Sequence, residues 1–458
     1  MATPSNDLNR ARLTRGPEGQ TIRSMMYPML IGMLSMVSYN LADTYFIGQL
    51  GAPELAAVSF TFPVVFFVGA VTVGLGNGTS AVCARLFGEE NIADVGRVAV
   101  HAMMLGVVAG LVFLVIGLMT IDPLFRLLGA DSSTLEIIHR YMRIYYFGGV
   151  FMVLPLIVNP VLRAAGDART PAVIMITAAT LKIALAPVLI FGLLGSPRLG
   201  IEGAAISTVV ANVGAMIASF CAIYFRDRLI SIGSLSLNLL MDSWRRILHV
   251  GLPSMASTVI GPVTTAFITS QVARFGHEAV AGYGVASRVE GLVSLVLMAL
   301  SVAVTPFVGQ NFGAGKFDRV DAGIRWANQF SLGYGLVIAA LLALGGPAIV
   351  GVFTDSETAI HAASLHMRVV PMSYLALGIA MTATNAFNAV GRPLPGMLIS
   401  MMRTILVYAP LAYILAREFG LPGIFAAACT ANFAAGICGF GLVRKVFAGF
   451  HRADLRVG

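Results

Sequence analysis

The sequence predicts an all-α polytopic membrane protein with twelve transmembrane helices in two six-helix lobes. Three observations predict this class. Hydrophobic residues make up 57% of the 458 residues and charged residues only 11%, against about 25% charged in ordinary soluble domains. Apolar runs long enough to cross a bilayer occur twelve times. The second half of the chain also repeats motifs of the first half.

The apolar runs define the expected domain organisation. They lie at about 25–48, 56–80, 94–119, 138–162, 171–194 and 201–225 in the first half, and at 248–272, 280–308, 323–352, 366–388, 395–416 and 422–446 in the second. We therefore expect the following parts: a flexible cytoplasmic tail over 1–24, an amino-terminal lobe over 25–225, a cytoplasmic linker over 226–247, a carboxy-terminal lobe over 248–446 and a second tail over 447–458.

Lys and Arg residues are distributed unevenly between the two sides of the predicted spans. If the amino terminus is inside, 20 of the 30 basic residues fall in inner segments. The positive-inside rule then places both termini in the cytoplasm. The formal net charge of +8 is explained by this asymmetry, so no nucleic-acid partner is expected.

The repeat relates the two halves at a nearly constant spacing along the chain. The matched segments are Leu50–Val58 with Phe275–Tyr283, Ala84–Gly96 with Gly309–Asp321, Arg163–Pro171 with Asn388–Pro395, and Leu199–Asn212 with Phe419–Asn432. Because six is an even number of spans, the halves cross in the same sense and form a parallel repeat. Two such lobes can enclose a cavity and rock around it to give alternating access.

Asp43 is the first candidate functional residue. It is a carboxylate within the first apolar run, where an ionisable side chain is costly and usually marks a pathway or a partner. Asn40 lies three residues earlier on the same helical face. If the helix starts at Met25, Asp43 lies about 27 Å along it, near the far end. A carboxylate that simply meets interfacial water is therefore the alternative interpretation.

Several motifs in order resemble one transporter family. They are ADTYFIGQLG in the first span, FGEENIADVG, GIEGAAIST, SRVEGLVSLVLMALSVAVTPFVGQNFGAGK and NAVGRPLPG. From about Met25 to Lys445 the chain resembles the multidrug and toxic compound extrusion (MATE) transporters, most closely the DinF-like bacterial branch. The resemblance implies a V-shaped two-lobed fold around a central cavity, a monomer, and a location in the bacterial inner membrane. It also implies an antiporter that exports organic, often cationic compounds against inward flow of H+ or Na+.

The resemblance carries an amino-lobe ion site onto matching positions only. Asp43 matches the acidic residue of the first helix, and Pro28 matches the proline associated with bending of that helix. Ala204 and Thr208 match positions where a backbone carbonyl and a hydroxyl face the site. The fifth span departs from the family, since it reads LKIALAP and carries Lys182 and Ala186 where the family often has an Asn and an Asp.

This departure argues against a sodium site of the usual form, because it removes two oxygen ligands and adds a positive charge. A lysine in the middle of a span is as costly as an aspartate, so we predict that Lys182 and Asp43 form an ion pair. Protonation of Asp43, or deprotonation of Lys182, would break the pair and make it a proton-controlled latch. The alternative is a permanent structural salt bridge.

Bulky apolar side chains of the first lobe are candidates for the substrate cavity. Met36, Tyr39, Phe66 and Met152 offer adaptable surface that suits promiscuous binding, and aromatic faces attract quaternary ammonium groups. Methionines and aromatics are also ordinary core and lipid-facing residues, so a structural role is favoured for any one of them taken alone.

The second lobe offers few polar candidates. Arg288 and Glu290 lie in the eighth span and Arg403 in the eleventh. Residues two apart do not share a helical face, so Glu290 is expected to pair with Arg403 between helices. We favour a structural role for all three over substrate binding.

The sequence thus predicts a proton-coupled efflux antiporter for lipophilic or cationic organic compounds in a lipid bilayer, with no cofactor and no metal. A Na+-coupled exporter is the nearest alternative, and a lipid-linked saccharide flippase of the same superfamily is another. A flippase would be expected to have fourteen spans or a cationic cavity. The absence of HExxH, GxSxG and Walker A motifs argues against an enzyme.

Overall fold

The structure is a computed structural model that describes residues 12–226, 236–352 and 356–454. Within these residues, twelve helical stretches are long and apolar enough to cross a membrane. The predicted all-α fold with twelve spans is confirmed.

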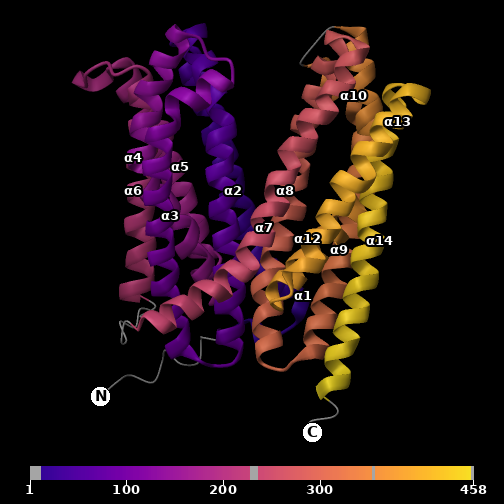
Figure 1. The fold of residues 1–458 in the computed structure, drawn as a ribbon. Coiled ribbons are helices and arrows are strands. Elements are labelled where there is room, and N and C mark those ends of the chain that lie inside the picture. Colours follow the sequence, from indigo (N-terminus) through magenta and orange to yellow (C-terminus); the bar gives the residue numbers. More distant parts are fainter. Residues whose placement is uncertain (1–11, 227–235, 353–355, 455–458) are drawn as a thin grey trace. The chain divides into compact units, whose positions relative to one another are not determined.

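The first half of the chain contributes six of these stretches (Figure 1). A short 3-10 helix, η2 (Arg12–Thr14), precedes them. The six spanning helices are α1 (Glu18–Gly48), α2 (Ala52–Gly88), α3 (Ile92–Leu127), α4 (Ser132–Ala164), α5 (Arg169–Phe191) and α6 (Ile201–Cys221).

The second half contributes α7 (Leu237–Val272), α8 (His277–Gly313), α9 (Phe317–Gly351), α10 (Glu357–Val369), α11 (Tyr374–Ala389), α12 (Pro393–Met401), α13 (Ala409–Phe419) and α14 (Leu421–Asp454). Two of its spans are composite. A 3-10 segment, η6 (Val370–Ser373), joins α10 to α11, and a π-helical segment, η7 (Met402–Tyr408), joins α12 to α13. Pro371 and Pro410 explain these breaks, because a proline lacks an N–H and crowds the carbonyl four residues earlier.

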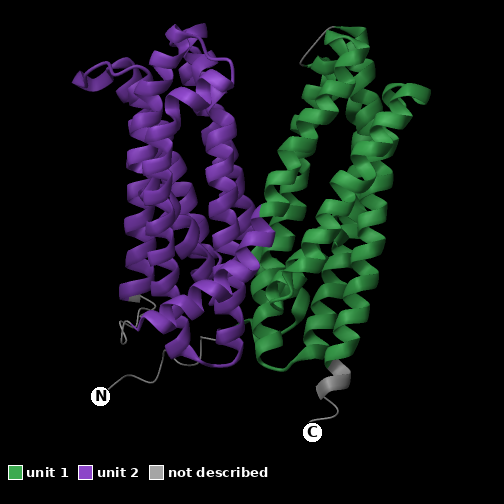
Figure 2. Ribbon diagram, viewed as in Figure 1, with its two compact units in different colours: residues 1–26, 256–458 green, residues 27–255 purple. Residues whose placement is uncertain are grey.

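The chain forms two compact units, coloured separately in Figure 2. The amino unit is residues 27–255, and the carboxy unit is residues 1–26 together with 256–458. The boundaries fall inside two helices, between Met26 and Tyr27 in α1 and between Met255 and Ala256 in α7. The first turns of each half's first helix therefore belong to the unit formed mainly by the other half.

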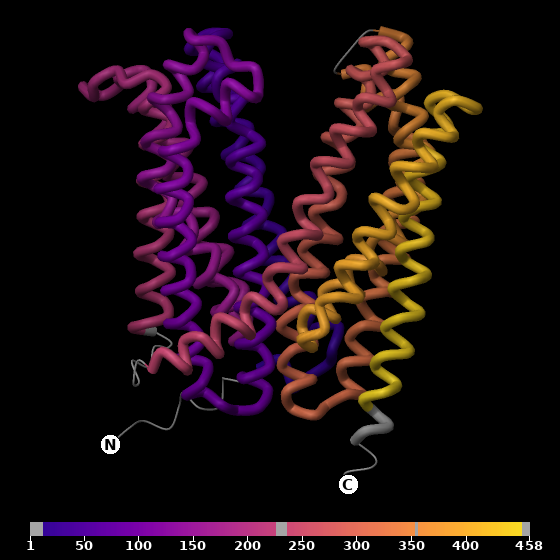
Figure 3. The backbone as a smooth tube through the Cα atoms, viewed as in Figure 1, coloured from indigo at the N-terminus to yellow at the C-terminus, as the bar shows by residue number. Residues whose placement is uncertain are grey.

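The segments expected to be a tail and a linker are partly helical. Residues 12–24 form η2 and the first turns of α1, and residues 237–247 begin α7, while 1–11 and 227–235 lie outside the described residues. Burial of apolar side chains explains why these segments are helical, since Ile22 and Ile247 are fully buried in their units. The backbone trace in Figure 3 follows both helices.

Glycines allow helices of the amino unit to approach closely. A Cβ at Gly203 of α6 would lie 2.6 Å from the carbonyl oxygen of Leu189 in α5. Small residues at such crossings let membrane helices pack backbone to backbone. This contact fixes α6 against α5, the helix that carries Lys182.

We predict that Gly203→Ala lowers stability by about 1–3 kcal/mol, because the backbone of α5 must shift to admit the methyl group. Gly214→Ala on the same helix is the matched control, since its Cβ would meet a side-chain atom of Leu181 at 3.6 Å, an ordinary contact. Thermal unfolding in detergent measures both variants. Equal midpoints would contradict the predicted backbone clash.

Candidate functional site

Asp43 of α1 and Lys182 of α5 form an ion pair in the amino unit. The Lys182 Nζ lies 3.0 Å from Asp43 Oδ2, and the side chains are only 6% and 15% exposed. The other carboxylate oxygen, Oδ1, is buried and has no hydrogen-bond partner among the described residues. Ala179 and Ala186, one turn before and after Lys182, are also buried. The helical face that carries Lys182 therefore points into the unit.

Tyr39 completes the surroundings of the ammonium group. It lies one turn before Asp43 on α1, and Lys182 Nζ is 4.4 Å from the centre of its ring. A ring face at this distance attracts a cation electrostatically. The ammonium is thus held between a carboxylate and an aromatic face, which is also a suitable environment for an organic cation.

A cavity of about 230 Å³ adjoins the pair within the amino unit. Met36, Tyr39 and Met152 line it as predicted, together with Lys182. Phe66 does not line it and is instead 43% exposed on α2. The face that each residue of α2 presents could not be read from the sequence, because the helix is apolar on all sides.

The cavity also has polar lining residues that the sequence analysis missed. They are Thr72, Asn159 and Asn212. Asn159 Oδ1 accepts a hydrogen bond from Ser219, and Asn212 Nδ2 donates one to the Thr208 carbonyl oxygen. An amide inside an apolar span was the available signal, since such a group needs a partner or a polar cavity.

The other predicted ion-site residues form hydrogen bonds within their own helices. Asn40 is exposed and its Nδ2 donates to the Met36 carbonyl oxygen of its own helix at 2.9 Å. The Thr208 hydroxyl donates to the Ala204 carbonyl oxygen at 3.0 Å, and both residues are buried. Pro28 lies inside α1 at the unit boundary. Of the predicted ion-site residues, Asp43 and Lys182 form an ion pair.

Comparison with known proteins identifies the family. The MatE family model matches the chain twice, at residues 28–188 and 253–414. The chain belongs to the MatE family. The two matches begin at Pro28 and at Pro253, which is the same spacing as in the repeat found in the sequence.

Relatives of this MatE protein are bacterial transporters. It is 33% identical over 439 residues to the FAD transporter of Shewanella oneidensis, covering 96% of this chain and 97% of that protein. It is 27% identical to the multidrug export protein MepA of Staphylococcus aureus, over 90% of both chains. The solved structure of the Vibrio cholerae MATE transporter VcmN in the bent form matches with a TM-score of 0.90 and 29% identity, covering 94% and 98% of the chains.

These comparisons establish a multi-pass membrane protein of a multidrug efflux transporter family, with the two-lobed twelve-helix fold. The relatives that identify the family are transporters, and MATE transporters are not enzymes.

The carboxy unit of this MatE protein pairs its polar residues differently from the expectation. Glu290 Oε2 lies 3.1 Å from His366 Nε2, while Arg403 donates to Asn432 Oδ1 at 3.2 Å. The expected Glu290–Arg403 pair is thus replaced by a Glu290–His366 pair between α8 and α10. Arg288 is exposed. His366 was missed because a lone histidine gives no signal of its partner in the sequence.

Proposed function

We propose that this MatE transporter is a secondary active antiporter that exports lipophilic, cationic organic compounds in exchange for H+ by alternating access. The observation that carries the proposal is the buried Asp43–Lys182 ion pair beside the cavity of the amino unit. The bacterial relatives and the distribution of basic residues support a bacterial inner membrane location with both termini in the cytoplasm.

The ion pair suggests that the proton and the organic cation exchange by competing for Asp43. In the resting site the Lys182 ammonium neutralises Asp43 and lies on the face of Tyr39. A monovalent organic cation needs the same two partners, so it binds best when Lys182 has lost its proton. Return of a proton to Lys182 then restores the ion pair and expels the cation. Proton and substrate compete for one carboxylate, which is the requirement for antiport.

Sodium coupling has less support at this site. Na+ requires several oxygen ligands, and Ala186 offers none beyond its backbone. The Asn40 amide bonds to its own helix. The Lys182 ammonium already occupies the position in front of Asp43, where it would repel a metal cation. Proton exchange on Lys182 needs no further ligand.

The test is proton movement in proteoliposomes that contain the purified protein. A gradient of a lipophilic monovalent cation is expected to drive protons across the membrane in the opposite direction to the cation. The rate is expected to be the same in Na+ and in K+ buffers. Because the site is neutral with either occupant, the flux is expected to be insensitive to membrane potential. A rate that requires Na+ would overturn proton coupling, and a strong dependence on potential would overturn the one-for-one exchange.

A flavin dinucleotide is the second candidate substrate. The relative from Shewanella oneidensis, at 33% identity, is named an FAD transporter. In the present cavity Lys182 could face a phosphate, while Tyr39 and Tyr145 offer rings for stacking. An anion would pair with Lys182 rather than replace it. Saturable FAD uptake into the same vesicles, with no uptake of lipophilic cations, would favour this substrate over the first.

A further inference from the structure

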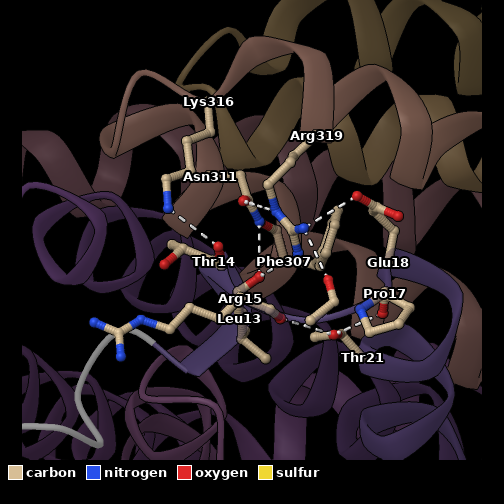
Figure 4. A network of polar contacts seen from close by, with 11 residues as sticks. Leu13, Thr14, Arg15, Pro17, Glu18, Thr21, Phe307, Asn311, Lys316 and Arg319 are labelled. Carbon is tan, nitrogen blue, oxygen red and sulfur yellow. Dashed lines mark hydrogen bonds and ion pairs between the residues drawn. The ribbon is translucent and has the colours of Figure 1, made fainter.

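The segment that precedes α1 is bound to the carboxy unit, although most of α1 belongs to the amino unit. Residues 12–17, which we call the N-terminal arm, lie across the end of α8 and the start of α9 (Figure 4). Leu13 and Thr14 are only 2% and 6% exposed. The arm is therefore packed against this surface and is not a loose tail.

Side chains of α8 recognise the arm through its backbone. The Leu13 N–H donates to Gln310 Oε1 at 3.1 Å, and Asn311 Nδ2 donates to the Leu13 carbonyl oxygen at 3.1 Å. Lys316, in the turn before α9, donates to the Thr14 carbonyl oxygen at 3.1 Å. Gln310 and Asn311 are completely buried, so this surface is built into the unit.

Arg319 of α9 links the arm to the start of α1. Its Nη1 donates to the Gly16 carbonyl oxygen at 2.8 Å and to Glu18 Oε1 at 3.0 Å, and its Nε donates to Asn311 Oδ1 at 3.0 Å. Its guanidinium also lies 5.9 Å from the centre of the Phe307 ring. Figure 4 shows that these groups converge on one side of the arm, while the Arg15 side chain points away.

The start of α7 has an equivalent crossing in the amino unit. Trp244 Nε1 donates to the His101 carbonyl oxygen at 2.9 Å, and the His101 ring bonds to Ser243 at 2.9 Å. In the register of the repeat that matches Pro28 with Pro253, Trp244 corresponds to Gly19 and Trp326 corresponds to His101. Gly19 indeed packs directly against the Trp326 ring. Each half thus has one tryptophan at this contact. In the amino unit it lies on the crossing helix, α7, and in the carboxy unit it lies on α9, the helix that is crossed.

A proline lies close to the residue at which α1 and α7 each pass from one unit to the other. Pro28 lies two residues after Met26, the last residue of α1 in the carboxy unit, and Pro253 lies two residues before Met255, the last residue of α7 in the amino unit. These are also the two prolines at which the family-model matches begin. A proline removes one helical hydrogen bond, so each helix lacks one backbone hydrogen bond close to the residue at which it passes from one unit to the other.

We propose that the N-terminal arm is an anchor that holds the first turns of α1 on α8 and α9, so that movement of the carboxy unit is transmitted along α1. The start of α7 is held on the amino unit through Ser243 and Trp244. The anchor makes the position of the Asp43 segment depend on the carboxy unit. This inference rests on the alternating access proposed above, but it does not depend on the coupling ion.

Two matched pairs of variants test the anchor. Deletion of residues 1–17 removes the arm, whereas deletion of 1–11 leaves it. Arg319→Gln removes the arm's guanidinium contacts, whereas Arg325→Gln changes an exposed arginine of the same helix. The readouts are substrate affinity, substrate counterflow, and hydrogen exchange of peptides that cover residues 18–26, which every variant keeps. Counterflow needs no proton coupling, so failure of the proposed H+ exchange leaves this test intact.

Without the anchor, hydrogen exchange over residues 18–26 is expected to rise, and counterflow turnover is expected to fall by about fivefold or more, the lower end of coupling between sites when the same free energy acts on turnover. The dissociation constant of the substrate is expected to stay unchanged, because the cavity lies in the amino unit. The two control variants should behave as the full chain. Faster exchange with unchanged turnover would overturn the proposal, and so would an equal loss of turnover in the controls.

Discussion

Asp43→Asn is expected to abolish drug-driven proton flux and to destabilise the protein. The substitution leaves the Lys182 ammonium, 6% exposed, without a counter-charge. Removal of one partner from a buried ion pair costs about 3–5 kcal/mol. Proton flux in proteoliposomes and thermal unfolding in detergent measure the two effects.

Two controls separate coupling from folding. Asp43→Asn combined with Lys182→Met removes both charges, so stability is expected to return while proton flux stays absent. Asp94→Asn removes a partner of Arg97 from a pair that is 27% exposed on both sides, and such surface pairs contribute about 0–1 kcal/mol. Normal coupling in Asp43→Asn would show that the pair has a structural role only.

Lys182→Arg is expected to keep the ion pair and to lose proton exchange. A guanidinium stays protonated under all ordinary conditions, so it can neutralise Asp43 but cannot yield its place by releasing a proton. Cation export and proton flux should both fall to background. The thermal midpoint should remain close to that of the unsubstituted chain if the longer side chain is accommodated.

Lys182→Met is expected to have the opposite effect to Lys182→Arg, because it leaves Asp43 free to bind a cation. Asp43 then lies beside the cavity without its ammonium, and a lipophilic cation can bind without displacing a proton from Lys182. Binding of the cation should lose the pH dependence that competition with the Lys182 proton imposes. Titrations of the purified variant at several pH values measure this. If Lys182→Arg transports with normal proton coupling, Lys182 is not the proton carrier, and protonation of Asp43 becomes the remaining route.

The sequence alone determined the number of spans, the repeat and the ion pair. Long apolar runs identify spans because a bilayer excludes unsatisfied backbone and charge. The same cost predicts that Asp43 and Lys182, single charges in two spans of one half, lie together, and the structure places them 3.0 Å apart. Met36, Tyr39 and Met152, which the sequence offered as candidates because of their bulk and adaptability, line a cavity of the amino unit, whereas Phe66, chosen on the same ground, does not.

The tertiary structure decided which faces and which ends of the helices meet. Spans that are apolar on all sides carry no periodic signal, so the sequence could not separate Phe66 from the cavity or place Asn159 and Asn212 in it. It also could not assign Glu290 to His366 rather than to Arg403. The N-terminal arm was read as a tail because its contacts use backbone groups of residues 13–16, which every sequence has. Only the position of α8 and α9 shows which side chains bind those groups.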